Sequence, residues 1–196
     1  MAAPPATAND REISAMSDIT RTNDLFFSRT GMDPKRVESL TDDAIGDADD
    51  GELFLEYRQS ESITFDDGRV RNASFDTSQG FGLRSVAGEA TGYAHSTELS
   101  EAAIARTGKT VRAVRGSASG TVASPPAGTN RDLYADINPL GSPSFEKKVA
   151  LLSEIDAYAR SSDPRIRQVT ASLSGNWQAI QIVRAGGLQV ADIRPM

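Results

Sequence analysis

The stretch that decides the fold is residues 53–86, which read LFLEYRQSESITFDDGRVRNASFDTSQGFGLRSV. Leu53, Leu55 and Tyr57 fall on one face of an extended strand, because successive side chains of a strand point to opposite faces. The dipeptide Asp67-Gly68 adopts positive φ easily and is typical of a two-residue hairpin turn, after which Phe75 continues the pattern on the returning strand. The stretch therefore predicts antiparallel strands joined by tight turns.

The end of this stretch and the residues that follow it predict one more hairpin. Residues 80–86 form a strand pattern, residues 87–89 supply a turn, and residues 91–95 return. We count about four or five strands in this meander. The Gly80-Phe81-Gly82 sequence resembles the start of a phosphate-binding loop, but Ser85 stands at the third glycine position and a strand follows. Glycines in neighbouring strands more often mark bulges or close backbone packing.

Three helices are predicted around these strands. The first begins at Asp33, which can cap it, with Pro34 at the first helical position. The second begins at Ser100 and runs to about Arg115. The third begins at Ser144 and ends at Asp163-Pro164, and it is the clearest helix in the sequence. Its apolar positions recur at helical spacing and are Phe145, Val149, Leu152, Ile155 and Ala159.

The carboxyl-terminal part predicts further strands. Residues 169–173 alternate up to a turn at Gly175-Asn176, residues 180–182 form a second strand, and a third strand begins at Leu188 after Gly186-Gly187. Strands joined by tight turns favour antiparallel pairing. The chain as a whole is predicted to be α+β, a mostly antiparallel sheet with helices packed on it, followed by the start of a second β-rich domain.

Composition divides the chain into three predicted regions. Residues 1–24 lack apolar periodicity and are interpreted as a disordered tail. Residues 25–128 form an amino-terminal α+β domain that ends in a Gly/Ser/Pro-rich linker at 116–128. Residues 129–196 are predicted to form a helix plus a β-meander that leads into a further domain.

Charge and composition exclude several classes of partner. The net charge is −6 and the pI is about 4.9, which argues against direct nucleic-acid binding. No stretch approaches the length of about 20 apolar residues that spans a bilayer, and we expect no membrane contact. The chain has no cysteine, which excludes disulfides and thiolate metal sites and fits a cytoplasmic location.

The residues that most invite a chemical role have ordinary structural explanations. His95 is the only histidine, and one imidazole without further ligands is typical of a surface or strand-end residue. The acidic run from Asp42 to Glu52 does not match a calcium loop, because Gly51 falls where an oxygen ligand is needed. We therefore assign no catalytic, cofactor-binding or metal-ligating residue to this chain.

Three segments together resemble the TldD and PmbA family, zinc metalloproteases also described as modulators of DNA gyrase. The first is residues 56–62 with the hairpin at 67–70. The second is residues 78–89 with 91–94, similar to the family's Gly-x-Gly-x-Arg strand and hairpin. The third runs from Leu133-Tyr134 through Pro139-Leu140 and the third helix to residues 169–175 and 192–195. The resemblance is strongest to the amino-terminal domain of the TldD branch.

The resemblance implies an enzyme whose catalytic residues lie outside these 196 residues. In the family, a His-Glu-x-x-x-His helix and a later cysteine hold zinc and activate water, and this chain contains neither. We expect the chain to be a scaffold that helps to form a protease chamber, with zinc in the full-length protein. The implied partner is a related TldE/PmbA-like subunit, and the implied substrates are peptides or unfolded proteins. The alternative is a stand-alone module that binds a peptide or partner without cleaving it.

Overall fold

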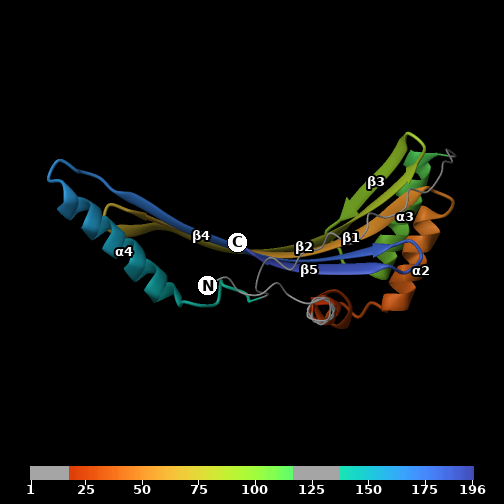
Figure 1. Ribbon diagram of the computed structural model, residues 1–196, viewed down its shortest axis with the longest axis horizontal. Helices are drawn as coiled ribbons and strands as arrows, with labels where there is room; N and C mark the ends of the chain where they lie inside the picture. Colours follow the sequence, from red (N-terminus) through yellow and green to blue (C-terminus); the bar gives the residue numbers. More distant parts are fainter. Residues whose placement is uncertain (1–17, 117–136) are drawn as a thin grey trace, which may run out of the picture. The chain divides into compact units, whose positions relative to one another are not determined.

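The computed structural model of the protein describes residues 18–116 and 137–196. Helices and one β-sheet make up these ranges (Figure 1). The helices are η1 (Asp24–Ser28), α2 (Pro34–Ile45), α3 (Glu101–Arg115) and α4 (Phe145–Ser162), and the strands are β1 (Asp50–Asp66), β2 (Arg69–Ala87), β3 (Ala90–Ser96), β4 (Thr170–Arg184) and β5 (Gln189–Pro195). The predicted α+β class is confirmed.

The five strands form one sheet in the order β3-β2-β1-β4-β5. Neighbouring strands run antiparallel, so Phe81 of β2 lies opposite Ser96 of β3 and Ala87 lies opposite Ala90. The two segments of sequence that flank residues 117–136 therefore meet side by side at the β1–β4 pair (Figure 1).

The hairpin at Asp67-Gly68 is confirmed. Asp67 has φ 51° and Gly68 has φ 80°, the pair of positive values that a type I′ turn requires. Asp66 next to the turn accepts hydrogen bonds from Gln168 Nε2 at 3.1 Å and Thr170 Oγ1 at 2.8 Å. These bonds fix the turn to the start of β4 and keep the pKa of Asp66 below its ordinary value.

The strands are longer and fewer than the sequence predicts. Residues 50–96 contain three strands instead of four or five, because β1 pairs with a neighbour on each side along its length and does not break. The predicted turn at Gly175-Asn176 is wrong, since β4 continues through it. Asn176 exchanges backbone hydrogen bonds with Met196 at 2.6 and 2.8 Å, and Leu140 lies where a side chain on Gly175 would go.

The prediction that residues 1–24 form a disordered tail is wrong for the last residues of that range. Residues 18–23 are helical and lead into η1, and Thr22 is fully buried with its hydroxyl donating to Asp18 O. Apolar periodicity gives no hint of this because the segment is short. Residues 1–17 lie outside the described residues, as does most of the predicted linker at 116–128.

The chain forms two compact units. Unit 1 takes the described residues of Met1–Tyr57, Gln79–Tyr134 and Ala179–Ile193, and unit 2 takes those of Arg58–Ser78, Ala135–Gln178 and Arg194–Met196. β1, β2, β4 and β5 contribute residues to both units. The units therefore interleave in sequence and do not follow a single boundary near residue 128.

In unit 1 the helices begin where their caps predict. Asp33 accepts a hydrogen bond from Arg36 N at 2.8 Å and starts α2, and Ser100 accepts one from Ala103 N at 3.1 Å and starts α3. α2 packs on α3, and α3 packs on β3. Gly92 of β3 permits this approach, because a Cβ there would collide with the carbonyl oxygen of Val111.

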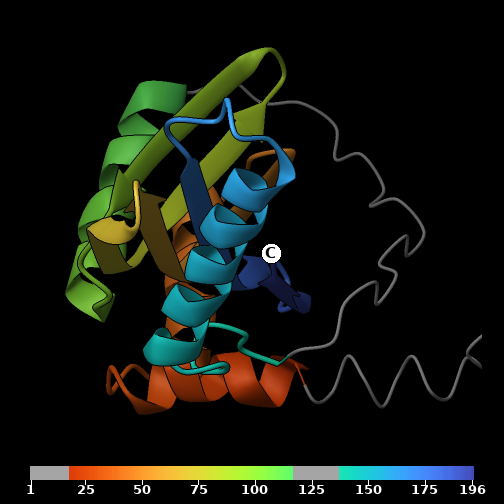
Figure 2. The same cartoon turned by 90° about the vertical axis from the view of Figure 1, so that its left-hand side faces the viewer.

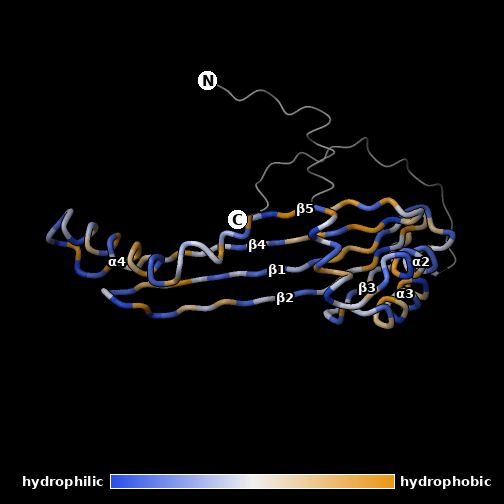
Figure 3. Tube along the Cα trace, turned by 90° about the horizontal axis from the view of Figure 1, so that it is seen from below, coloured by the Kyte–Doolittle hydropathy of each residue, from blue (hydrophilic) through white to orange (hydrophobic). Residues whose placement is uncertain are grey.

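The core of unit 1 lies between these helices and one face of the sheet. Alternate residues of β1 point into it, and Figure 3 shows apolar positions recurring along the strands beside α2 and α3. The buried members are Phe26, Phe27, Met32, Val37, Leu40, Ala44, Leu53, Leu55, Phe81, Leu83, Leu99, Ala103, Ile104, Val111 and Val183. This continuous apolar cluster is what holds the helices on the sheet.

In unit 2, α4 lies along the strands and its outer side faces the viewer in Figure 2. The fully buried apolar cluster is small and consists of Ile63 and Phe65 from β1 and Leu152 from α4. Val149 and two residues of β4 pack partly buried against it. α4 is thus held by far less apolar contact than the helices of unit 1.

The helix α4 is confirmed, and its inward face is centred on Leu152 of the predicted apolar set, but the outer members of that set are exposed. The residues turned inward are Lys148, Leu152 and Asp156, spaced by one helical turn each. Phe145 and Ile155, two members of the predicted apolar set, are 47% and 43% exposed. Two polar residues, Lys148 and Asp156, therefore flank Leu152 on the inward face.

Candidate functional site

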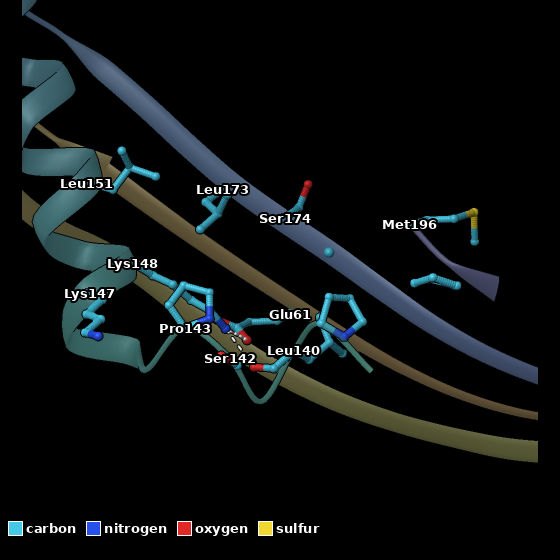
Figure 4. A pocket seen from close by; sticks show the side chains of 13 residues that line it. Glu61, Leu140, Ser142, Pro143, Lys147, Lys148, Leu151, Leu173, Ser174 and Met196 are labelled. Atoms are coloured by element: carbon cyan, nitrogen blue, oxygen red, sulfur yellow. Dashed lines mark hydrogen bonds and ion pairs between the residues drawn. The ribbon is translucent and has the colours of Figure 1, made fainter. Parts of the chain in front are cut away.

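The candidate site is an apolar groove in unit 2, beside the first turns of α4. Its volume is about 460 Å³, within the range of small-molecule pockets. The loop that precedes α4, the inner face of α4 and a segment of β4 form its walls (Figure 4). The lining residues are Glu61, Pro139, Leu140, Ser142, Pro143, Lys147, Lys148, Leu151, Leu173, Ser174, Gly175, Pro195 and Met196.

A buried ion pair forms the polar part of this groove. Lys148 Nζ lies 2.7 Å from Glu61 Oε2 and also donates to Leu140 O at 2.7 Å (Figure 4). The two side chains are only 8% and 14% exposed. A buried ammonium needs such partners, because an unpaired charge away from water is strongly destabilising.

Helix geometry places Lys148 in this position. Ser144 is the N-cap of α4, and Lys148 N donates to its carbonyl oxygen at 3.1 Å, so Lys148 comes one turn into the helix. Glu61 lies on β1 two residues before Ile63 and thus shares the inward face with the small core. The Leu140 carbonyl comes from the loop that precedes α4. This loop is held by a hydrogen bond in which Leu140 N donates to Asn138 Oδ1 at 2.9 Å.

A second hollow of about 320 Å³ shares the ion pair with the groove. Leu140 and Pro143 line both spaces, and the second one extends to Phe75 of β2 and Phe145 at the start of α4. Both of these phenylalanines are about half exposed, at 57% and 47%. The loop before α4 therefore presents apolar surface on two sides.

The carboxyl-terminal half of α4 is held by a different polar cluster. Asp156 Oδ2 accepts from Arg160 Nε at 3.0 Å, and Arg160 also pairs with Asp67 at the hairpin turn. The hydrogen bond from Asp156, followed by that from Asp67, raises the pKa of Arg160 above its ordinary value. Ion pairs thus connect both ends of α4 to β1 and its turn.

The groove combines apolar walls with one buried ion pair. An ammonium has three N–H donors, and Lys148 directs two of them to Glu61 and Leu140. The apolar walls exclude water from a ligand, and the remaining donor can select an acceptor such as a peptide carbonyl. Two acceptors of unit 2 thus hold the Lys148 side chain in place.

The described residues do not fit a zinc site. Within 18–116 and 137–196, no group of three or more histidine, cysteine, aspartate or glutamate side chains is placed to hold a metal ion. His95 is an exposed residue of β3 whose ring lies 6.0 Å from that of Tyr93. The same ranges contain no helix long and apolar enough to cross a membrane.

The acidic run of the sequence is dispersed over unit 1 and does not form a cation site. Asp42 Oδ1 accepts from Gly186 N, Asp47 pairs with Arg115 at 2.9 Å, and Asp49 Oδ2 accepts from Gly88 N. The hydrogen bond from Arg115 lowers the pKa of Asp47. Each carboxylate therefore anchors a different loop or helix end.

The glycines at 80 and 82 serve close packing, which confirms the structural interpretation. A Cβ on Gly80 would lie 2.6 Å from the carbonyl oxygen of Ser96, and one on Gly82 would lie 2.9 Å from the hydroxyl of Tyr93. Both of these contacts are with residues of β3.

The sequence analysis did not predict the Lys148–Glu61 pair. The signal that could have indicated it is the alternation of Glu61, Ile63 and Phe65, which places Glu61 on the same face of β1 as two buried apolar residues.

The fold and groove define a class of protein: an α+β protein with helices packed on one antiparallel sheet and an apolar groove beside α4. Two sequence models of one family match the chain. PmbA/TldA metallopeptidase domain 1 matches residues 51–118, and the PmbA/TldA metallopeptidase central domain matches residues 138–196. The chain belongs to the PmbA/TldD family of metallopeptidases.

Similar proteins agree with this assignment. The chain is 35% identical over 151 residues to the metalloprotease TldD homolog of Haemophilus influenzae, covering 76% of the chain and 31% of the relative. The homolog from Buchnera aphidicola subsp. Schizaphis graminum is 29% identical over 158 residues, covering 80% and 33%. The chain thus spans about a third of the length of the curated relatives it matches.

Solved structures share the fold at low sequence identity. TldE from Thermococcus kodakarensis matches with a TM-score of 0.67 and 16% identity over 82% of this chain and 37% of that chain. A protein from Bacteroides thetaiotaomicron described as a modulator of DNA gyrase matches with a TM-score of 0.66 and 15% identity over 82% and 38%. These similarities show the fold alone.

Proposed function

We propose that this chain is the non-catalytic, chamber-forming part of a TldD-like zinc metalloprotease subunit that acts on peptides or unfolded proteins. The observation that carries the proposal is the paired match of residues 51–118 and 138–196 to the first and central domains of the family. The dense core of unit 1 supports a scaffolding role. The sequence holds one histidine and no cysteine, so the zinc ligands that the family resemblance implies are not among these 196 residues.

The whole protein, in this proposal, supplies zinc ligands outside these residues. The described ones offer the exposed His95 and scattered carboxylates, which do not converge on one point. The chain's own part is to form a wall and to contact a related subunit of the TldE/PmbA type. The similarity to TldE in fold is consistent with two related subunits of one architecture.

Metal analysis and a peptidase assay test the proposal. After dialysis, the chain is expected to hold no stoichiometric zinc and to leave a mixture of unfolded-protein substrates intact. A version extended to the length of the TldD relatives should bind one zinc and cleave. One tightly held zinc in the short chain, with a peptidase activity lost on chelation, would contradict the proposal.

The groove of unit 2 favours the second candidate, a module that binds a peptide or partner without cleaving it. Its apolar walls and the single remaining donor of Lys148 fit an apolar peptide segment. Binding of fluorescent apolar peptides by the isolated chain, lost in a Leu173→Asp variant, would favour this module. No binding at any accessible concentration would leave the scaffold as the better account.

A further inference from the structure

The part of β2 that belongs to unit 2 has an exposed outer edge. The order of strands places β3 on the outer side of β2, and the pairing of these two strands extends from Ala87 opposite Ala90 to Phe81 opposite Ser96. Residues 69–78 therefore have no neighbouring strand on that side within the described part of the chain, and every one of them is exposed. We call residues 69–78 the β2 edge. Figure 3 shows it as the outermost trace beside β1.

A free strand edge offers main-chain hydrogen-bonding groups to another chain. The outward N–H and C=O groups of the β2 edge face no strand among the described residues. Natural proteins protect such edges with proline, with lysine or with a covering helix. The β2 edge reads RVRNASFDTS, contains neither proline nor lysine, and is exposed along its whole length. It is therefore a template for an added strand.

One face of the β2 edge carries two cations and an aromatic ring. Arg69, Arg71, Ala73 and Phe75 occupy alternate positions and therefore share a face. Phe75 is 57% exposed, and with Ala73 it lines the second hollow beside α4. This face presents positive charge close to the hairpin turn and apolar surface farther along the strand.

The positive charge of the β2 edge is not neutralised within unit 2. Neither Arg69 nor Arg71 takes part in an ion pair among the described residues. The two carboxylates of the adjacent turn are bonded elsewhere, since Asp66 accepts hydrogen bonds from the start of β4 and Asp67 pairs with Arg160. Two guanidinium groups are thus available to a second molecule, on a chain whose net charge is −6.

We propose that the β2 edge binds an extended acidic segment of another protein, which adds to the sheet as an antiparallel strand. Main-chain hydrogen bonds hold the segment, and its side chains give selectivity. Acidic residues at two alternate positions lie opposite Arg69 and Arg71, because directly opposed side chains of antiparallel strands are about 4.5–5.5 Å apart. Apolar residues of the segment lie opposite Ala73 and Phe75. This binding goes beyond the proposed function and does not depend on zinc or on peptide hydrolysis.

A labelled peptide tests the proposal on the 196-residue chain. The probe is fluorescein-labelled Thr-Val-Thr-Val-Thr-Glu-Thr-Glu-Thr, whose antiparallel order places its valines opposite Phe75 and Ala73 and its glutamates opposite Arg71 and Arg69. Fluorescence anisotropy should show saturable binding. A second peptide with lysine in place of both glutamates should bind about tenfold more weakly, because two attractive cross-strand pairs become repulsive.

An exchange of charges locates the binding site. Arg69→Glu combined with Arg71→Glu should weaken binding of the glutamate peptide about tenfold and strengthen binding of the lysine peptide by a similar factor. The matched control, Lys35→Glu combined with Lys109→Glu, makes the same change in net charge at exposed positions of unit 1 and should leave both affinities unchanged. Circular dichroism checks that both variants are folded.

N-methylated peptides test strand addition without any change to the chain. The N–H groups of alternate residues in an antiparallel strand point to the same side. Methylation of the alternate set that faces the β2 edge should abolish binding of the glutamate peptide, whereas methylation of the other set, which faces solvent, should leave binding intact. This comparison decides the proposal even where the arginine variant fails to fold.

Four outcomes would overturn the proposal. The first is that the glutamate peptide does not bind, or binds no better than the lysine peptide. The second is equal tolerance of the two methylated peptides, which would exclude strand addition. The third is equal weakening by the arginine and lysine variants, which would show that only net charge matters. The fourth is loss of peptide binding as the chain concentration rises, which would show that a second copy of the chain covers the β2 edge.

Discussion

Units 1 and 2 share strands of one sheet but are stabilised in different ways. Unit 1 packs helices on strands through a continuous apolar cluster that includes large, fully buried residues such as Phe26, Leu53 and Ile104. Among its described residues, unit 2 buries only four apolar side chains, Ile63, Phe65, Leu140 and Leu152, and α4 is seated by the Lys148–Glu61 and Arg160–Asp67 pairs. Burial of one large apolar side chain contributes about 1.5–3 kcal/mol, whereas a buried ion pair gives little net stability.

The difference explains where the chain can interact. Unit 1 buries most of its large apolar side chains and exposes Tyr93, Val114 and Leu188, while unit 2 leaves Leu151, Ile155 and Tyr158 and the groove accessible. Exposed apolar surface such as that of unit 2 is typical of a region that contacts another molecule. The predictions below test this comparison in order of decreasing effect.

The largest effect is expected from breaking the buried ion pair. Lys148→Met leaves the Glu61 carboxylate buried without a cation and should destabilise unit 2 by about 3–5 kcal/mol. The fluorescence of Trp177, the only tryptophan and a residue of unit 2, reports its unfolding in urea. Combining the change with Glu61→Leu should recover most of the loss. A cost below 1 kcal/mol for Lys148→Met alone would contradict the polar support of unit 2.

Equivalent leucines in the two cores sharpen the comparison. Leu55 of unit 1 and Leu152 of unit 2 are 0% and 1% exposed, and each change to alanine should cost about 2–5 kcal/mol. We expect Leu55→Ala at the upper end, because its dense surroundings cannot close the cavity, and Leu152→Ala at the lower end. Urea unfolding followed by circular dichroism and by Trp177 fluorescence measures both. The reverse order would show that unit 2 is the better packed.

Helix caps give a smaller contrast. Ser100 caps α3 through its side chain, so Ser100→Ala should cost about 1 kcal/mol. Ser144 makes no side-chain cap bond on α4, and Ser144→Ala should cost much less. Thermal melting of both variants against the unchanged chain tests this. Equal losses would mean that Ser144 supports α4 in another way.

The smallest effect concerns acid. Burial alone would raise the pKa of Asp50, but the hydrogen bond and charge of Arg184, with Arg84 nearby, outweigh it and the pKa is lowered from 3.8. A carboxyl with a lowered folded pKa contributes stability above its unfolded pKa, and this contribution is lost as pH falls through the folded pKa. Asp50→Asn should therefore flatten the loss of stability below about pH 4. The measurement is the free energy of unfolding of both proteins as a function of pH. The same slope below about pH 4 in the variant and in the unchanged chain would contradict the prediction.

The sequence by itself determined the local features. The Asp67-Gly68 turn, the caps at Asp33 and Ser100 and the span of α4 follow from the φ preferences, capping groups and periodicity of a few adjacent residues. The family resemblance was also available from spacing of short segments. The turn, the caps and the span of α4 depend on interactions within about one turn of helix or one hairpin.

Tertiary structure alone decided the rest. Gly175-Asn176 reads as a turn, yet Leu140 fills the space beside Gly175 and Met196 bonds to Asn176, so β4 continues. The apolar periodicity of α4 gives no sign that a lysine lies on its inward face, but Lys148 is buried there because it pairs with Glu61 of β1. Local sequence carries propensity, whereas the partner of a backbone group or of a buried charge lies tens of residues away and is fixed only when the strands have paired.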